Sequence, residues 1–269
     1  MLKAILHGKS GRIESQSDST ISWRQLYKAR EDLLTAAVFC RFGYISQQLQ
    51  AELLRSWLTN ASSSFDDFED IEFWPSFTYE YDDGTNRVEP DLVLRFSSAN
   101  VIVEIKPPTG GNQSYTQWYR EIASFLNDEK STNKPLYFLG IGRIENVDIP
   151  YCREQLINEF EELKDLVALP WQQVTNQLIE IDKRDSKHVC PRDKRVIHDM
   201  LQALSLYGLK VSPFKWEDLT KNSLPRIDFE TVKSLLSSES QFKPSHTLSD
   251  SLLQTRLSPF DLSLFKNWN

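Results

Sequence analysis

The stretch Val101-Ile-Val-Glu-Ile-Lys106 decides the fold of this chain, together with Asp91-Leu-Val-Leu-Arg-Phe96 shortly before it. Both segments are rich in β-branched and apolar residues, and the polar Ser97-Ser-Ala-Asn100 between them has the composition of a turn. The sequence therefore predicts a β-hairpin. Because alternate side chains of a strand lie on opposite faces, Glu104 and Lys106 share one face.

The polarity of the two segments predicts how the strands pair. A hairpin closed with Phe96 opposite Val101 places Asp91 opposite Lys106 and leaves Glu104 on the same face. The other face then holds only apolar side chains: Leu92, Leu94, Phe96, Val101, Val103 and Ile105. A slip of one residue would mix polar and apolar side chains on both faces. We therefore expect Asp91, Glu104 and Lys106 to gather at one end of the hairpin.

Two carboxylates and an amine in one place suit a specific chemistry. Neighbouring carboxylates repel each other, and a hard divalent cation such as Mg²⁺ relieves this by taking oxygen ligands from both. A lysine beside the cation can orient or deprotonate a water, or neutralise the charge that develops on a phosphate under attack. The cluster therefore predicts metal-assisted phosphodiester hydrolysis. The alternative is a cross-strand salt-bridge ladder on a solvated sheet face.

Pro90-Asp91 followed, after a hairpin, by Glu104-Ile-Lys106 resembles the signature of the PD-(D/E)xK nuclease superfamily. The resemblance implies an α/β, restriction-endonuclease-like core with a mixed central sheet flanked by helices. It also implies that Asp91 and Glu104 ligate Mg²⁺ and that Lys106 serves the attacking water. Members of this superfamily often carry a further Glu on a helix before the hairpin and a polar residue on the helix after it.

Glu31 is the candidate for the upstream acid. We expect a helix over residues 23–42, opened by a capping box that begins at Ser22. Glu31 then shares an apolar stripe with Leu34 and Val38, where an unpaired carboxylate would be costly. A metal ion or Lys106 would compensate the charge. The alternative is that Glu31 turns toward solvent.

Gln117 is the candidate for the downstream polar residue. The Pro-Pro-Thr-Gly-Gly run at 107–111 ends the strand, and a helix is expected over residues 114–126. By resemblance Gln117 contacts the active site or the nucleic-acid backbone, and the alternative is a surface glutamine. A further buried strand is expected over residues 134–140, which gives the order strand, strand, helix, strand.

Composition limits the class of protein. The chain has 269 residues, of which 40% are hydrophobic, and it can bury a sizeable core. No apolar run is long enough to span a bilayer, so we expect a cytoplasmic protein without a membrane partner. The cysteines and histidines are scattered without disulfide, zinc or triad spacing, which argues against those chemistries.

The formal net charge of −7 is unfavourable for binding a polyanion. The acidic excess lies mainly at residues 65–72 and 80–83, which we interpret as a solvated turn region leading into a strand over residues 77–81. Glu80 is a reserve candidate for a metal carboxylate. Basic residues concentrate at 183–195 and suit phosphate contacts, although a charged linker would have the same composition.

The domain organisation predicted from these patterns has two parts. Residues 1–189 form the nuclease-like domain, with an N-terminal hairpin within residues 4–13 and a helical pattern over residues 151–169. Residues 190–269 form a small, mainly helical C-terminal region, which begins with a helix over residues 196–209.

The function expected from the sequence is that of a Mg²⁺-dependent endodeoxyribonuclease, with Mn²⁺ as an alternative ion. By resemblance it belongs to anti-phage defence, restriction or transposition, and its partner is DNA. The chain lacks a phosphate-binding loop, so a partner subunit would supply any ATPase or targeting function. Double-strand cutting with one site per chain would favour a homodimer. The alternatives are a catalytically inactive scaffold that binds nucleic acid or a partner protein, and an RNA-cleaving nuclease.

Overall fold

The computed structural model describes residues 30–212, apart from positions 60, 64, 82–83, 129–133 and 186, and scattered positions before residue 30. The chain divides into a compact unit Met1–Pro213 and a second unit Phe214–Asn269. The part of the predicted C-terminal region beyond residue 212 lies outside the described residues.

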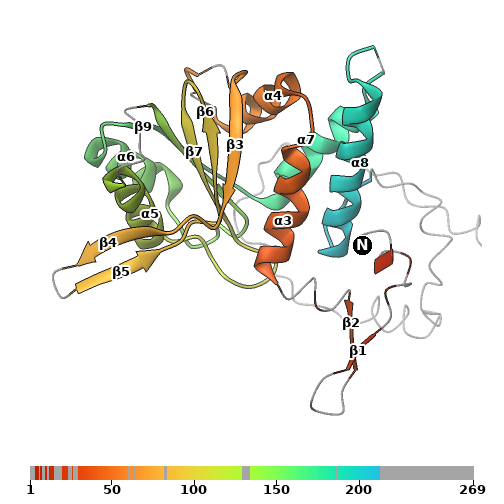
Figure 1. The fold of residues 1–269 in the computed structure, drawn as a ribbon, viewed down its shortest axis with the longest axis horizontal. Helices are drawn as coiled ribbons and strands as arrows, with labels where there is room; N and C mark the ends of the chain where they lie inside the picture. Colours follow the sequence, from red (N-terminus) through yellow and green to blue (C-terminus); the bar gives the residue numbers. More distant parts are fainter. Residues whose placement is uncertain are drawn as a thin grey trace, which may run out of the picture. The chain divides into compact units, whose positions relative to one another are not determined.

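A five-stranded mixed sheet forms the centre of the first unit (Figure 1). In spatial order its strands are β3 Phe68–Phe73, β6 Leu92–Phe96, β7 Asn100–Ile105, β8 Leu136–Ile141 and β9 Leu163–Leu169. The first three strands pair antiparallel, and β7, β8 and β9 pair parallel. The predicted order of strand, strand, helix and strand is confirmed for β6, β7, α5 and β8.

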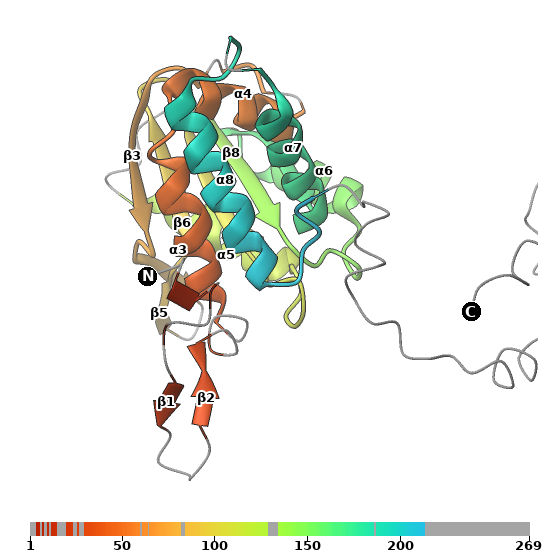
Figure 2. The same ribbon diagram turned by 90° about the vertical axis from the view of Figure 1, so that its right-hand side faces the viewer.

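Helices cover both faces of the sheet (Figures 1 and 2). One face packs against α3 Glu31–Phe42, α4 Gln47–Trp57, α7 Trp171–Lys183 and α8 Pro191–Leu206. The other face packs against α5 Tyr115–Asn127 and α6 Ile149–Glu159. The predicted α/β class, with a mixed sheet flanked by helices, is therefore confirmed.

The central hairpin pairs with a register two residues away from the predicted one. Leu92 pairs with Val103 and Leu94 with Val101. The reason is a tighter turn, closed by the Phe96 N–H donating to the Ala99 carbonyl at 2.9 Å. An even shift leaves every side chain on its expected face. The six predicted apolar residues are accordingly all buried in one core: Leu92, Leu94, Phe96, Val101, Val103 and Ile105.

The first helix begins later than predicted. Arg30 has an extended backbone with φ −120° and ψ 115°, so the expected helix over residues 23–42 is not continuous and α3 begins at Glu31. The N-terminal hairpin is formed by β1 Arg12–Glu14 and β2 Thr20–Ser22. The strands that pair are therefore not both within residues 4–13, where the hairpin was predicted.

Two further sequence interpretations are wrong. The acidic stretch at residues 65–72 is not a turn region, because β3 forms an edge strand there, and charged side chains are common on solvent-facing edges. Residues 151–169 are not one helix, because α6 ends at Glu159 and β9 begins at Leu163. A short apolar run in a parallel sheet cannot be distinguished from a helix by its spacing alone.

Two elements frame the region around the site. The predicted strand over residues 77–81 is confirmed as β4 Phe77–Tyr81, which forms a hairpin with β5 Gly84–Val88. The Phe77 ring packs at 5.6 Å from that of Phe125, which fixes this hairpin against α5.

Among the described residues, no helix combines the length and apolar character needed to cross a membrane.

Helix α8 belongs to the same compact unit as the sheet. The Ser46 hydroxyl and backbone N–H, just beyond the end of α3, both donate to the Asp193 carboxylate near the start of α8. Buried apolar residues of α8 also complete the core on the α3 face. The boundary expected after residue 189 stays a prediction.

Candidate metal centre

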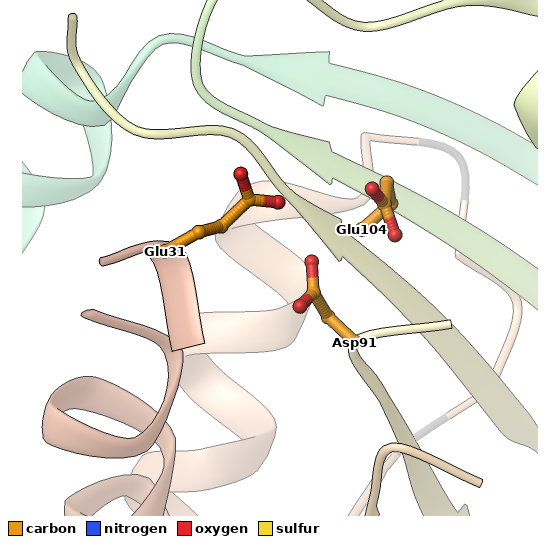
Figure 3. Close-up of side chains that lie close together, drawn as sticks. All are labelled: Glu31, Asp91 and Glu104. Carbon is orange, nitrogen blue, oxygen red and sulfur yellow. The ribbon is translucent and has the colours of Figure 1, made fainter. Parts of the chain in front are cut away.

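Three carboxylates from separate elements converge at one end of the sheet. One oxygen each of Glu31, Asp91 and Glu104 lies within 4.8 Å of the other two. Figure 3 shows the three carboxyl groups turned toward one another, from a helix, a loop and a strand. The structure thus brings together the acids that the sequence selected from positions far apart in the chain.

Asp91 lies in the loop before β6 and is held by the neighbouring strand. Its Oδ2 accepts the backbone N–H of Ile105 at 2.7 Å, and the residue is 7% exposed. Burial, and then the nearby Glu104 carboxylate, raise the pKa of Asp91 to about 8, although the Ile105 hydrogen bond opposes the shift. A carboxyl group with this pKa loses its proton most readily when a bound cation replaces the proton.

Glu104 lies on β7 and is almost completely buried. Its Oε1 accepts hydrogen bonds from Lys106 Nζ at 2.5 Å and from Gln117 Nε2 at 2.6 Å. Burial raises the pKa of Glu104 even though the Lys106 ammonium opposes the shift. Val93 and Ile102, on the same face, are fully buried, so this face is not the solvated one that a surface salt-bridge ladder requires.

Lys106 follows β7 and connects two of the acids. Besides Glu104, its Nζ contacts Glu31 Oε1 at 2.9 Å. Burial alone would lower the pKa of Lys106, but the two carboxylates outweigh it and the net pKa is raised. Its backbone is fixed as well: its N–H donates to the Ile141 carbonyl, and its carbonyl accepts from Trp171 Nε1 at 2.8 Å.

Gly142 is required where the backbone passes Lys106. Its φ is +129°, which L side chains rarely adopt, and a Cβ there would lie 2.1 Å from the Lys106 carbonyl oxygen. The close approach of these two backbone segments therefore sets the position of Lys106.

Glu31 reaches the cluster from the first turn of α3. Its side chain is 32% exposed. This value lies between the two alternatives given by the sequence, a position on the apolar stripe and a side chain turned toward solvent. Because α3 packs on the face opposite to α5, Glu31 meets the other acids only where the sheet ends. The ion pair with Lys106 provides the compensation that the sequence predicted for it.

Gln117 lies on α5 and connects Glu104 with a further acid. Its Nε2 donates to Glu104 Oε1 and to Glu121 Oε1, the latter at 2.8 Å. Glu121 is 2% exposed, and its pKa is raised well above the ordinary value by burial and by the Glu104 carboxylate. The sequence reasoning did not select Glu121, although one signal was present. This glutamate lies on the buried face of an amphipathic helix, among Trp118, Ile122 and Phe125.

Gln113 is a second residue that the sequence reasoning did not select. Its buried Nε2 donates to the carbonyls of Glu104 and Ile141, and its Oε1 accepts from Trp118 Nε1 at 2.7 Å. It therefore ties the start of α5 to the ends of two strands. No spacing rule distinguishes such a glutamine from an exposed one.

The basic stretch 183–195 lies away from the cluster. Asp193, in that stretch, contacts Ser46 beyond the end of α3, whereas Glu31 is at its start. A twelve-residue helix separates its two ends by about 16 Å. Lys183 and Arg184 pair with glutamates at 2.6 and 2.5 Å. The side chain of the reserve candidate Glu80 lies outside the described residues.

Comparisons of this chain with protein-family models, with curated proteins and with solved structures found no match. The functional argument therefore depends on the geometry of the cluster.

Proposed function

We propose that this protein is a Mg²⁺-dependent endodeoxyribonuclease with the restriction-endonuclease-like core of the PD-(D/E)xK superfamily. The observation that carries the proposal is the convergence of Glu31, Asp91 and Glu104 within 4.8 Å, with Lys106 Nζ bonded to two of them. One ammonium group does not balance three buried or half-buried carboxylates, and a divalent ion would relieve the remaining repulsion.

The donor set suits a hard cation. All three side chains offer carboxylate oxygen, which Mg²⁺ and Mn²⁺ prefer over nitrogen or sulfur. Asp91 and Glu104 would be the principal ligands, with Glu31 supporting the same ion or a second one. When bound, the ion would polarise a phosphoryl oxygen and lower the pKa of a coordinated water.

Lys106 would act as a fixed cation. In the metal-free cluster the Glu104 and Glu31 carboxylates raise the pKa of Lys106, so its side chain is protonated at neutral pH. An ammonium held at this position can orient the attacking water and stabilise negative charge on the phosphate oxygens. Of the roles considered for Lys106, these two fit its electrostatics best.

Gln117 would act through Glu104. Its amide donates to the same Glu104 oxygen as Lys106, which fixes the rotamer of that carboxylate. Hydrogen bonds to metal-ligating side chains typically tune affinity in this way.

The biological setting follows from the resemblance alone. DNA cutting in anti-phage defence, restriction or transposition is the proposed context. A partner subunit would supply any ATPase or targeting function, and two copies would be needed to cut both strands together.

The test is cleavage of a supercoiled plasmid by the full chain. We expect nicking or cutting with Mg²⁺ or Mn²⁺, protection by EDTA, and loss of cleavage in Lys106→Ala. The matched control is Lys164→Ala, because Lys164 is exposed on β9 and bonds only to the Glu161 carbonyl among the described residues. If Lys106→Ala cuts as fast as wild type, the assigned roles are wrong.

The same assay addresses the alternatives. An RNA substrate run beside the plasmid distinguishes a ribonuclease. Absence of metal-dependent cleavage on either substrate, with nucleic-acid binding that survives Asp91→Ala and weakens as salt rises, would indicate an inactive scaffold.

A further inference from the structure

A groove lies beside the carboxylate cluster, between α5 and the end of β5. Its volume is about 390 Å³, within the range of about 300–1,000 Å³ typical of ligand sites. The residues that line it include Arg87, Glu89, Ser114, Thr116, Gln117 and Arg120. The β4–β5 hairpin forms one wall, and its packing against α5 through Phe77 and Phe125 holds that wall in place.

The groove is continuous with the candidate metal centre. Gln117 and Glu121 both line it, and Gln117 Nε2 donates to Glu104 Oε1 at 2.6 Å. The Gln117 side chain therefore contacts both Glu104 and the groove.

The charge of the groove differs from that of the cluster. Arg87 and Arg120 are exposed on its walls, although the chain as a whole carries a formal charge of −7. Arg87 pairs with Glu89 at 3.0 Å, but both side chains are largely exposed, at 66% and 42%. Such surface pairs contribute little, so a phosphate can replace the glutamate and use the guanidinium fork.

Of the two acids that line the groove, Glu121 presents little charge to an occupant. Glu121 is 2% exposed, and its Oε1 is covered by the Gln117 amide. The exposed charged groups of the groove are therefore Arg87, Arg120 and Glu89, which give it a net positive charge.

The start of α5 adds neutral donors. Ser114 is the N-cap residue and its side chain makes no capping hydrogen bond, while Thr116 follows in the first turn. Hydroxyl groups and the positive end of a helix both suit phosphate oxygens, and here they accompany two arginines.

We propose that this groove binds the sugar-phosphate backbone of the nucleic-acid strand next to the bond to be cut, with Arg87 and Arg120 as phosphate contacts. The choice of nucleic acid as the ligand rests on the proposed function. The arrangement resolves the conflict between an acidic protein and a polyanionic substrate. It assigns phosphate binding to the groove and not to the basic stretch 183–195.

The test measures binding without catalysis. A fluorescein-labelled DNA duplex is titrated with the full chain in EDTA, and anisotropy gives the Kd at several salt concentrations. We expect the double variant Arg87→Gln/Arg120→Gln to raise the Kd by about tenfold or more. Loss of two phosphate contacts also lowers the slope of log Kd against log salt by about 2.

The matched control removes the same charge at the start of α8, in the basic stretch. Arg192→Gln/Arg195→Gln changes two exposed arginines of the basic stretch, and we expect its Kd and salt slope to equal those of wild type. Circular dichroism checks that both double variants are folded. The variant Arg120→Lys keeps the charge, so it should retain the wild-type salt slope.

Three results would contradict nucleic-acid binding by the groove: no binding by wild type, equal losses of affinity in both double variants, or a loss of affinity only in the α8 variant. An RNA duplex of the same sequence shows which nucleic acid fits, and a groove-dependent loss with either supports the inference. Cleavage is scored separately with Mg²⁺. Binding through the groove without cleavage would reject the nuclease activity and support the groove as a nucleic-acid site. Cleavage by wild type, with binding unaffected in the groove variants, would support the nuclease activity and reject the groove.

Discussion

The two faces of the β6–β7 hairpin differ in what they bury. The face toward α3, α4, α7 and α8 buries only apolar side chains from these two strands, among them Leu94, Phe96 and Val103. The face toward α5 buries Val93 and Ile102 in its middle, but Glu104 lies at its end, 2% exposed. The same alternation of side chains thus produces a structural face and a face that ends in a charged cluster.

The difference shows where this fold retains an electrostatic cost. A buried carboxylate is unfavourable unless hydrogen bonds and a cation compensate it. Around Glu104 the compensation comes from Lys106 and Gln117, yet its pKa remains raised. An apolar residue at such a position would cost less, and buried groups with a perturbed pKa cluster at functional sites.

The largest expected effect belongs to the apolar face. Phe96→Ala removes a fully buried ring that packs against Phe65 and Phe68 at 5.3 and 5.6 Å. We expect the free energy of unfolding in urea to fall by about 3–5 kcal/mol. Tyr44→Ala, at a side chain that is 67% exposed, should cost about 0.5 kcal/mol or less. Equal losses would mean that the α3 face is not the principal core.

Gly142→Ala tests how the backbone positions the cluster. The added Cβ would meet the Lys106 carbonyl oxygen at 2.1 Å in a strained conformation, so we expect a loss of about 2–4 kcal/mol in unfolding free energy. Cleavage should be lost as well, although no charged group is altered. Gly110→Ala is the control, because its φ is +92° but a Cβ there meets nothing within 4 Å. It should cost only the strain, about 1–2 kcal/mol, and leave cleavage intact.

The charged end of the α5 face predicts an unusual dependence of stability on pH. Because the pKa of Asp91 is about 8 when folded and 3.8 ordinarily, the folded state holds a proton that the unfolded chain has released between these values. The free energy of unfolding of the metal-free protein should therefore fall as pH rises from about 4 to 8, by up to about 1.4 kcal/mol per pH unit.

Thermal melts between pH 5 and 9 measure this effect, with Asp91→Asn as the control. This variant should make the slope shallower but not remove it, because the raised pKa values of Glu104 and Glu121 contribute with the same sign. Added Mn²⁺ should stabilise the wild type more as pH rises, since binding requires the ionised carboxylate. A wild-type curve that matches the Asp91→Asn curve at every pH would show that Asp91 titrates normally.

Glu121 gives the smallest expected effect. Glu121→Met removes the acceptor that orients the Gln117 amide, so we expect kcat to fall about tenfold while the KM for DNA is unchanged. Glu121→Gln keeps an acceptor oxygen and should restore most of the rate. Glu154→Met on the exposed side of α6 is the control. A change in KM, with kcat unaltered, would assign Glu121 to substrate binding instead.

The sequence was sufficient to predict the local features that depend on alternation. The apolar face of the hairpin, the presence of α5 and the convergence of Asp91, Glu104 and Lys106 at one end follow from which residues share a face. The register was wrong by two residues, because turn length is set by backbone hydrogen bonding at Phe96 and Ala99, which composition does not specify.

The remaining features depend on tertiary packing. Glu121 becomes significant only because α5 places it beside Gln117 and Glu104. The basic stretch 183–195 suggested phosphate contacts, but the contact between Ser46 and Asp193 places it at the other end of α3 from Glu31. Edge strand β3 was missed because acidic residues have low strand propensity and the pairing with β6 overrides it.

The central claim is that Glu31, Asp91 and Glu104 form one cation site. Anomalous diffraction from a crystal soaked in Mn²⁺ tests it most directly. The account predicts a peak about 2.1 Å from carboxylate oxygens of Asp91 and Glu104, with Glu31 bound to the same ion or to a second one beside it. The absence of a peak among these three residues, or carboxyl groups that point away from one another, would contradict it.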